Sequence, residues 1–334
     1  MNSLKPMLLS SLKSYDKSQF FKDVTAGIIV AIIALPLSIA LALASGVGPE
    51  AGIFTAIVAG FVISALGGSS VQIAGPTAAF ATIVAGIVAH DGMDGLIVAT
   101  ILAGIFLILM GLCHFGSLIK FIPFTITTGF TSGIAVTIVI GQLKDFFGLT
   151  YPTGVKPIET VEKFEAVIHH FSTMNVDAVI VGVVSLVILI IAPYIFKRIP
   201  GSLLAVIAGI LMVQFLPLKV NTIGNLYTIS NALPSLHFPS LSLNVIQNAL
   251  PNALTIAVLA AIESLLSCVV ADGMINGKHR SDMELVAQGA GNIASALFGG
   301  IPATGAIART AANIKNGGRT PIAGMVLSLI HISE

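Results

Sequence analysis

The chain has 334 residues, of which 55% are hydrophobic and only 9% are charged, and its net charge is +1. Soluble domains carry about 25% charged residues, so this composition excludes a soluble protein and predicts an integral membrane protein without a sizeable soluble domain. No basic cluster indicates nucleic-acid binding. Cys113 and Cys268 both lie in apolar segments, which favours buried thiols over a disulfide or a metal site.

The apolar segments predict the spans in chain order. Residues 1–22 are polar and lysine-bearing, so no cleavable signal is expected and the first span serves as its own targeting signal. A membrane-spanning helix needs ~20 apolar residues. On this criterion we predict about eleven spans, near 23–46, 50–67, 77–89, 95–113, 119–140, 176–196, 200–216, 246–271, 283–299, 305–315 and from 320 onward. Residues 141–177 and 217–243 are predicted to be loops.

The lysines and arginines predict the orientation. With a cytoplasmic N-terminus, eleven of them fall on the cytoplasmic side and four on the other, while Arg309 lies in the membrane. The N-terminus is therefore predicted to be cytoplasmic. The chain ends at Glu334 inside an apolar segment, where a carboxylate would be costly. We interpret this as a truncated reading frame, whose last few residues are not necessarily native.

Two stretches predict broken membrane elements. Residues 299–318 lie between apolar segments, yet they contain Pro302, two glycine pairs and Arg309, which disfavours a continuous span. We expect an extended piece over Ile301–Thr304 and a half-helix from about Gly305. Residues 67–77 repeat the design, with Pro76 and Thr77 opening an apolar helix. Helix starts at membrane depth favour an anion, and paired interruptions indicate a transporter binding site.

Glu263 lies near the middle of the eighth predicted span, with Ser267 one turn later on the same helix face. A carboxylate at that depth costs about 2.5–3.5 kcal/mol on insertion scales, so it is a functional candidate by default. The pair could share a proton or a cation, with Na⁺ held at Glu263, Ser267 and Gly305 as one possibility. Alternatively, Glu263 is a structural hydrogen-bonding residue.

Arg309 lies four residues after Gly305, on the same face of the predicted half-helix. A guanidinium beside helix-start N–H groups suits an oxyanion. Alternatively, Arg309 pairs with Glu263 and stabilises packing. Thr77, Thr304 and Thr310 offer hydroxyl groups near the two helix starts, and each alone could equally be a cap or a packing residue.

Other chemistry finds little support in the sequence. His169 and His170 are followed by no second ligand pair at zinc spacing. The chain contains no nucleotide-binding loop of the Walker type, no zinc-protease helix motif and no nucleophile elbow. We therefore predict that the protein is not an enzyme, and that it needs no cofactor beyond a coupling H⁺ or Na⁺.

Seven motifs together resemble the sulfate permease (SulP) family, the bacterial relatives of the solute carrier family 26 anion transporters. The resemblance covers nearly the whole chain, and the motifs are strong only in combination. They are Asp23-x-x-Ala-Gly27, Ala34–Ala40, Ser45–Gly52, Gln72–Thr77, Ala261–Ser267, Gly300–Thr310 and Gly317–Thr320.

This resemblance implies an all-α polytopic membrane protein with seven-plus-seven inverted repeats, of which about eleven of fourteen spans are present. Two half-helices preceded by short strands are part of that fold. The implied organisation is a cytoplasmic segment (1–22), a core domain (23–113 with spans 1–4, and 246–334 with spans 8–11, truncated) and a gate domain (114–245, spans 5–7 with loops). The family usually has a cytoplasmic C-terminal STAS domain, which is not expected within these 334 residues. A homodimer in a bacterial inner membrane is implied for the full-length protein.

The resemblance also implies the site residues. The anion is expected at Thr77, Ala78, Thr304, Gly305, Ala306 and Arg309, and the coupling ion at Glu263 and Ser267. Animal members carry a glutamine and aromatic residues where this chain has Leu37, Leu41 and Thr77, so their halide transport does not carry over. The predicted function is secondary active transport of a small inorganic oxyanion, sulfate first, coupled to H⁺ or Na⁺. A bicarbonate or dicarboxylate transporter and an anion channel are the alternatives.

Overall fold

A computed structural model describes residues 4–117, 124–155, 157–196, 201–227, 234–239 and 242–333. The chain divides into two compact units. One comprises Met1–Thr127 with Ser230–Glu334, and the other comprises Thr128–Ile229.

The larger unit begins with α1 (Met7–Ser11), η1 (Leu12–Ser14), α2 (Lys17–Ala44) and α3 (Pro49–Leu66), followed by the two-residue strand β1 (Ala74–Gly75), η2 (Ala78–Phe80) and α4 (Ala81–Leu112). Asp16 caps α2, since its carboxylate accepts from the Gln19 backbone N–H at 2.7 Å. The spans predicted over 77–89 and 95–113 follow each other within α4. They are separated by a kink at Gly92, whose φ is +70°.

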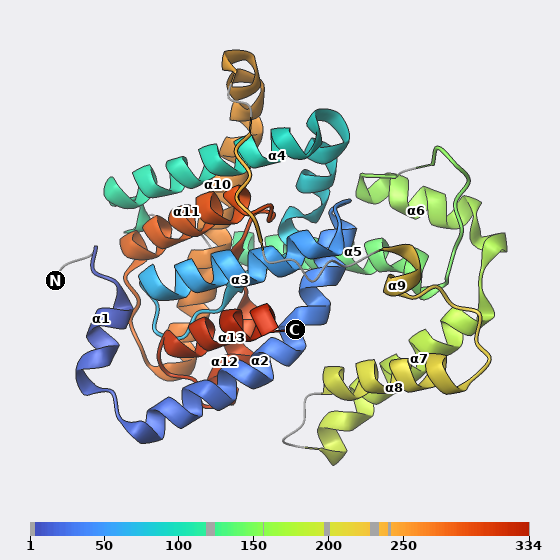
Figure 1. The fold of residues 1–334 in the computed structure, drawn as a ribbon, viewed down its shortest axis with the longest axis horizontal. Coiled ribbons are helices and arrows are strands. Elements are labelled where there is room, and N and C mark those ends of the chain that lie inside the picture. The colour runs from blue at the N-terminus through green and yellow to red at the C-terminus, as the bar shows by residue number, and fades with distance from the viewer. Residues whose placement is uncertain are drawn as a thin grey trace. The chain divides into compact units, whose positions relative to one another are not determined.

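The second part of this unit repeats that order of elements (Figure 1). A long helix, α10 (Leu243–Ile275), and a second helix, α11 (Ser281–Leu297), precede the strand β2 (Thr304–Gly305), the short α12 (Ile307–Lys315) and α13 (Ile322–Ser333). The half-helix predicted from about Gly305 therefore begins at Ile307, because Thr304 and Gly305 are taken up by the strand. We call residues 67–89 the first broken element and residues 299–315 the second.

The smaller unit contains most of α5 (Phe124–Phe146), then α6 (Thr160–His169), η4 (Phe171–Thr173), α7 (Val176–Ile195), α8 (Gly201–Phe215) and α9 (Ile223–Leu226). The prediction of plain loops at 141–177 and 217–243 was wrong in part, because α6, η4 and α9 lie there. A capping box of Glu159 and Glu162 starts α6. Residues 119–123 of the fifth predicted span lie outside the described residues.

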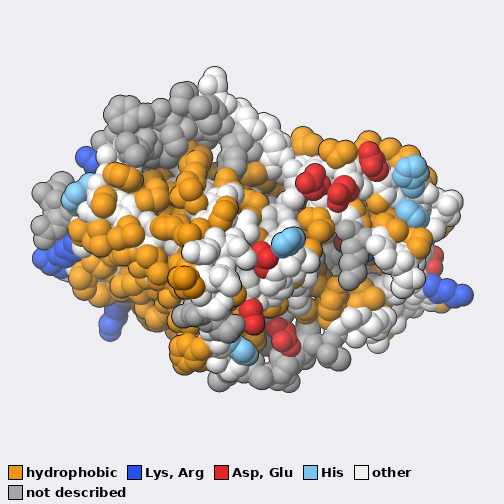
Figure 2. Space-filling model, turned by 90° about the horizontal axis from the view of Figure 1, so that it is seen from above, with side chains coloured by type: hydrophobic (Ala, Val, Ile, Leu, Met, Phe, Trp, Pro, Cys, Tyr) orange, Lys and Arg blue, Asp and Glu red, His pale blue; other side chains and the backbone are white. Residues whose placement is uncertain are grey.

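Five helices in the described residues are long and apolar enough to cross a membrane, namely α2, α3, η2 with α4, α7 and α10. Their outer faces are apolar where they meet no other helix; on α7, for example, Ile190 is 60% exposed. Figure 2 shows broad areas of hydrophobic side chains on one face, with few charges among them. Such surfaces suit lipid and would be unfavourable in water.

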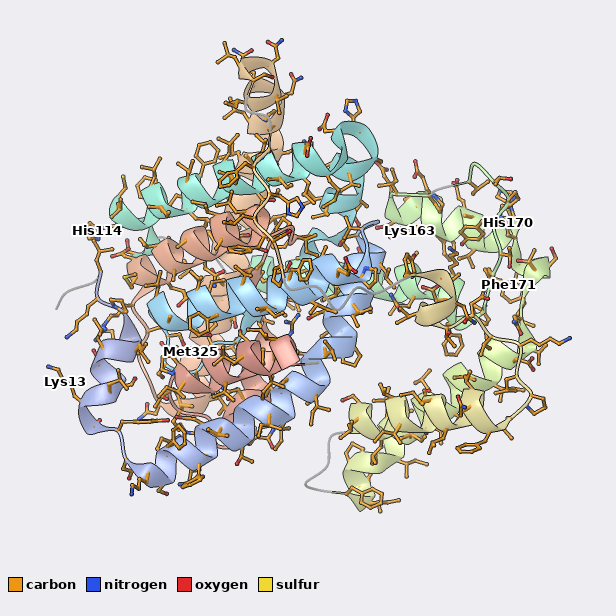
Figure 3. The ribbon with its side chains drawn as sticks, in the orientation of Figure 1. Lys13, His114, Lys163, His170, Phe171 and Met325 are labelled. Carbon is orange, nitrogen blue, oxygen red and sulfur yellow. The ribbon has the colours of Figure 1, made fainter. Side chains whose placement is uncertain are left out.

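The helices α4 and α11 pack closely through glycines. A Cβ atom added at Gly104 would lie 2.6 Å from the Gly289 carbonyl oxygen, and Gly289 faces Gly104 in turn. At the end of α4, the ring Nδ1 of His114 lies 2.8 Å from the Asp282 carboxylate at the start of α11 (Figure 3). Small residues let the two backbones approach, as is common between membrane helices.

Gly104→Ala is expected to destabilise the protein despite the better helix propensity of alanine. The added methyl group would force α4 and α11 apart, and overpacking of this kind costs about 1–3 kcal/mol. Gly86→Ala is the matched control on α4, since a Cβ there meets nothing within 4 Å. Thermal unfolding in detergent should show a lower midpoint for Gly104→Ala alone. Equal midpoints would contradict the tight crossing.

Candidate functional site

The two broken elements meet through their strands. β1 and β2 pair antiparallel, with Ala74 opposite Gly305 and Gly75 opposite Thr304. The Ala306 N–H extends the pairing by donating to the Ile73 carbonyl at 2.9 Å. Because each strand leads into a helix, η2 begins at Ala78 and α12 begins at Ile307 immediately beyond the pair. The structure thus brings together the two predicted helix starts.

Arg309 extends from the first turn of α12 across this strand pair. It is only 3% exposed, and its Nη2 donates to the Pro76 carbonyl of the first broken element. Its Nε and Nη1 are buried and have no hydrogen-bond partner in the described residues. Gly75 makes room for the guanidinium, since a Cβ there would collide with Nη1. A buried cation with two unused donors is costly unless an acceptor completes it.

The helix α10 supplies polar contacts to both broken elements. The Thr77 hydroxyl donates to Glu263 Oε2 at 2.9 Å, and the Thr304 hydroxyl donates to the Ala260 carbonyl at 3.1 Å. The Ser267 hydroxyl donates to Thr310 Oγ1 at 3.4 Å. The structure therefore joins Glu263 to the first broken element and Ser267 to the second, and no hydrogen bond joins the two α10 residues to each other among the described contacts.

Two alternatives left open by the sequence can now be judged from the contacts. Thr77 precedes η2 but makes no side-chain cap there, since its hydroxyl is bonded to Glu263. The ion pairs found in the described residues all involve histidines, and none joins Arg309 to Glu263. Glu263 therefore does not supply the acceptor that the Arg309 guanidinium lacks.

Several supporting residues were missed by the sequence reasoning. The second broken element is held by Thr55 of α3, whose hydroxyl accepts from the Ile301 N–H at 2.7 Å, and by Asn292 of α11, which accepts from the Ala303 N–H at 2.9 Å. On α11, the buried polar residues Glu284, Gln288, Asn292 and Ser295 recur at helical spacing. This stripe of polar residues inside an apolar segment was the feature of the sequence that could have identified α11 as a support for the site.

A second polar cluster surrounds Asp23 at the start of α2. Its buried carboxylate accepts from the Thr320 hydroxyl at 2.6 Å, the Arg319 N–H at 2.8 Å and the Tyr15 hydroxyl at 3.0 Å. Burial and the nearby Asp23 raise the pKa of Tyr15 to about 12, so the phenol remains a donor at physiological pH. These contacts join the beginning of α2 to the segment that follows α12.

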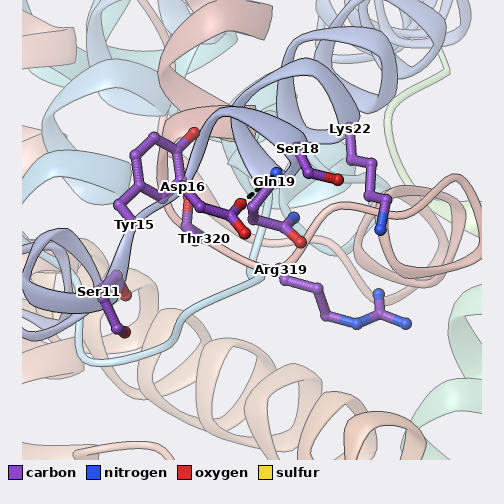
Figure 4. A pocket seen from close by; sticks show the side chains of 9 residues that line it. Ser11, Tyr15, Asp16, Ser18, Gln19, Lys22, Arg319 and Thr320 are labelled. Atoms are coloured by element: carbon purple, nitrogen blue, oxygen red, sulfur yellow. Dashed lines mark hydrogen bonds between the residues drawn. The ribbon is translucent and has the colours of Figure 1, made fainter.

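A cavity of about 360 Å³ lies beside this cluster, and Figure 4 shows the side chains that line it. It is lined by residues of α1, η1, the start of α2 and the segment after α12, including Lys22, Asp16 and Arg319. None of the predicted anion-binding residues lines it. Across the described residues, no group of three or more His, Cys, Asp or Glu side chains could hold a metal ion.

The chain resembles known proteins in both sequence and structure. A profile of the sulfate permease family matches residues 20–333. The chain is 44% identical over 324 residues to the putative sulfate transporter YvdB of Bacillus subtilis, covering 95% of this chain and 60% of the relative. It is 33% identical over 319 residues to the bicarbonate transporter BicA of Picosynechococcus, covering 92% of this chain and 56% of the relative. The chain thus spans little more than half the length of these relatives.

The fold is also shared with solved structures. The transmembrane domain of a cyanobacterial bicarbonate transporter BicA matches with a TM-score of 0.84 and 31% identity, covering 96% of this chain and 82% of that domain. SLC26A9 matches with a TM-score of 0.83 at 19% identity, covering 99% of this chain and 56% of that structure, which supports the fold alone. The predicted inverted-repeat transporter fold is confirmed. With its profile match from residue 20 to residue 333, the chain belongs to the sulfate permease family.

Proposed function

We propose that this protein carries out secondary active transport of a small inorganic oxyanion, with sulfate as the first candidate. The observation that carries the proposal is the buried Arg309 guanidinium, whose Nε and Nη1 lack partners in the described residues. It lies beside the β1–β2 pair, and each of these strands is followed by the first turn of a helix. Charge-assisted donors and helix N-termini both favour an oxyanion.

In this proposal, the anion binds between the two broken elements. Thr77 and Ala78 contribute from the first, and Thr304, Gly305, Ala306 and Arg309 contribute from the second. Arg309 belongs to the second broken element, and its guanidinium donates to the Pro76 carbonyl of the first. The guanidinium therefore lies between the two elements, where the anion is proposed to bind. Such a site can close around an anion and release it when the unit that contains it moves.

We further propose that Glu263 carries the coupling ion, H⁺ or Na⁺, with Ser267 in support. Glu263 accepts from Thr77, which belongs to the proposed anion site. Binding of a cation or a proton at Glu263 would therefore alter the local charge and the hydrogen bond next to the anion. This gives a physical route for coupling two binding events.

The remaining proposals concern the protein in its membrane. We propose a bacterial inner membrane with a cytoplasmic N-terminus, as the distribution of lysine and arginine predicts. The full-length protein is proposed to form a homodimer. The proposed role is transport and not enzymatic catalysis, in line with the family to which the chain belongs.

Bicarbonate is the second candidate substrate for two reasons. The bicarbonate transporter BicA of Picosynechococcus is 33% identical to this chain, and the solved transmembrane domain of a cyanobacterial BicA is 31% identical. Sulfate is placed first because the putative sulfate transporter is 44% identical. Both are oxyanions that a guanidinium and amide N–H groups can bind. The proposed site therefore accommodates the chemistry of either substrate.

Uptake into proteoliposomes tests the proposal. The full open reading frame that encodes this chain would be reconstituted, and radiolabelled sulfate and bicarbonate would be supplied separately while the Na⁺ and pH gradients are varied independently. Concentrative sulfate uptake driven by one gradient is expected. Uptake of bicarbonate alone would replace sulfate with the second candidate. Currents far above carrier turnover in a bilayer recording would favour an anion channel instead.

A further inference from the structure

The Glu284 carboxylate on α11 holds the beginning of the first broken element. Its Oε2 accepts from the backbone N–H groups of Gly68 at 2.9 Å and Ser69 at 3.2 Å. Its Oε1 accepts from the side-chain amides of Gln72 at 2.8 Å and Gln288 at 2.9 Å. Glu284 is 1% exposed. All of these partners are donors, so the buried carboxylate is fully engaged by the segment that follows α3 and by its own helix.

Gln72 carries this contact toward the proposed anion site. Its amide donates to Glu284, and its Oε1 accepts from the Cys268 thiol of α10 at 2.7 Å. The side chain also lies directly against Gly305, where a Cβ atom would overlap it. One side chain thus connects α11, α10 and the strand of the second broken element.

The two broken elements interlock reciprocally at this place. The Gln72 side chain of the first element lies against Gly305 of the second. In return, the Arg309 side chain of the second element lies against Gly75 of the first. The strand pairing places these two glycines on adjacent rungs, with Ala74 opposite Gly305 and Gly75 opposite Thr304. A displacement of Gln72 would therefore disturb the strand register that sets the position of Arg309.

We propose that Glu284, acting through Gln72, is a positioning residue for anion binding: it fixes the strand pair and thereby the distance between the Arg309 guanidinium and the two helix starts. This inference rests on the proposed function, since it assigns Glu284 a role in the same anion site. The neutral side chains of Thr55 and Asn292 accept hydrogen bonds from the backbone of the second broken element. The charged carboxylate of Glu284 plays the same part for the first broken element.

Glu284→Gln tests the proposal with little change in size. A glutamine has one carbonyl oxygen and one NH₂ group, so it cannot accept from both sets of donors. The first broken element then loses either the Gly68 and Ser69 bonds or the Gln72 bond. We expect the KM for sulfate uptake to rise about 10-fold, with kcat kept within about two-fold, because a misplaced receptor weakens binding before it slows the conformational change.

Cys268 offers a readout that does not depend on transport. These 334 residues contain two cysteines, so Cys268 is the single thiol once Cys113, and any cysteine encoded elsewhere in the full open reading frame, is replaced by serine. In that background, Cys268 is buried and bonded to Gln72, and slow labelling by a membrane-permeant maleimide is expected. Glu284→Gln should accelerate labelling by about 10-fold, because the loosened Gln72 no longer covers the thiol.

Two further variants keep the test decisive. Gln72→Leu breaks only the link to Glu284 and Cys268 while Glu284 retains Gly68, Ser69 and Gln288, so it serves if Glu284→Gln fails to fold, and it should also accelerate labelling. Asp282→Asn is the matched control: it neutralises a carboxylate on the same helix, but Asp282 contacts His114 and Gly116. Both KM and labelling should be unchanged in Asp282→Asn.

The outcomes separate this inference from the proposed function. Unchanged KM and unchanged Cys268 labelling in a folded Glu284→Gln protein would overturn the positioning role, even if Arg309 variants lose anion affinity. Faster labelling without any rise in KM would show that Glu284 stabilises the fold without affecting anion binding, and this result would also overturn the positioning role. If Arg309 variants keep their affinity, the proposed function fails independently of the labelling result.

Discussion

Arg309→Gln is expected to raise the KM for the transported anion by about 100-fold, which corresponds to about 2.7 kcal/mol. Glutamine carries no charge, and its amide ends where the Nε of Arg309 lies. The variant therefore loses the guanidinium charge, the unused donor at Nη1 and the bond from Nη2 to the Pro76 carbonyl. The measurement is the concentration dependence of uptake into proteoliposomes, with thermal unfolding measured on the same samples.

Arg319→Gln is the matched control for this prediction. Arg319 follows the same short helix, but its guanidinium donates to the Ile314 and Gly318 carbonyls at the far end of α12. Its loss should leave the KM unchanged. If Arg309→Gln kept wild-type affinity while it lowered the unfolding midpoint, Arg309 would be a packing residue and the anion site would have to lie elsewhere.

Glu263→Gln is expected to uncouple transport from the driving gradient. The amide preserves the size of the side chain and can accept from the Thr77 hydroxyl, as the carboxylate does at 2.9 Å. It can neither bind a proton in the same pH range nor attract Na⁺ with a charge. The accumulation ratio of the anion should therefore fall to about one, the value for equilibration without a coupled ion.

The measurement for Glu263→Gln is uptake under imposed pH and Na⁺ gradients, each varied alone. Asp272→Asn provides the control on the same helix. The Asp272 carboxylate accepts from His279, which follows α10, and no side-chain hydrogen bond from it to the broken elements is found in the described residues. Full retention of the gradient response in Glu263→Gln would make Glu263 a structural hydrogen-bonding residue. A lost response in both variants would point to damage of α10 as a whole.

These two predictions separate affinity from energy coupling within one site. Arg309 lies on the second broken element, whereas Glu263 reaches the first through Thr77. Because the β1–β2 pair joins the two elements, a change on one side can be transmitted to the other. A double variant whose effects on KM are not additive would measure that coupling directly.

The sequence by itself determined the class of protein and the places where the membrane helices break. Composition indicates whether a chain folds in water or in a lipid bilayer. Glycine and proline act on their own backbone, so the breaks at residues 67–77 and 299–305 could be recognised locally. Long apolar helices such as α2, α3 and α10 lie where apolar segments were predicted to span the membrane. The helix α6 was missed because its signal is a capping box in a polar segment, which a search for apolar spans does not detect.

The tertiary structure decided which groups meet. The pairing of Ala74 with Gly305, the bond from Arg309 to the Pro76 carbonyl and the bridge from Glu284 to Gly68 all join residues more than 200 positions apart. The sequence suggested a Glu263–Arg309 pair as one alternative, but the contacts connect Glu263 to Thr77 instead. No local pattern encodes such partners, because they depend on the register of two strands and on glycines that admit side chains from the opposite element.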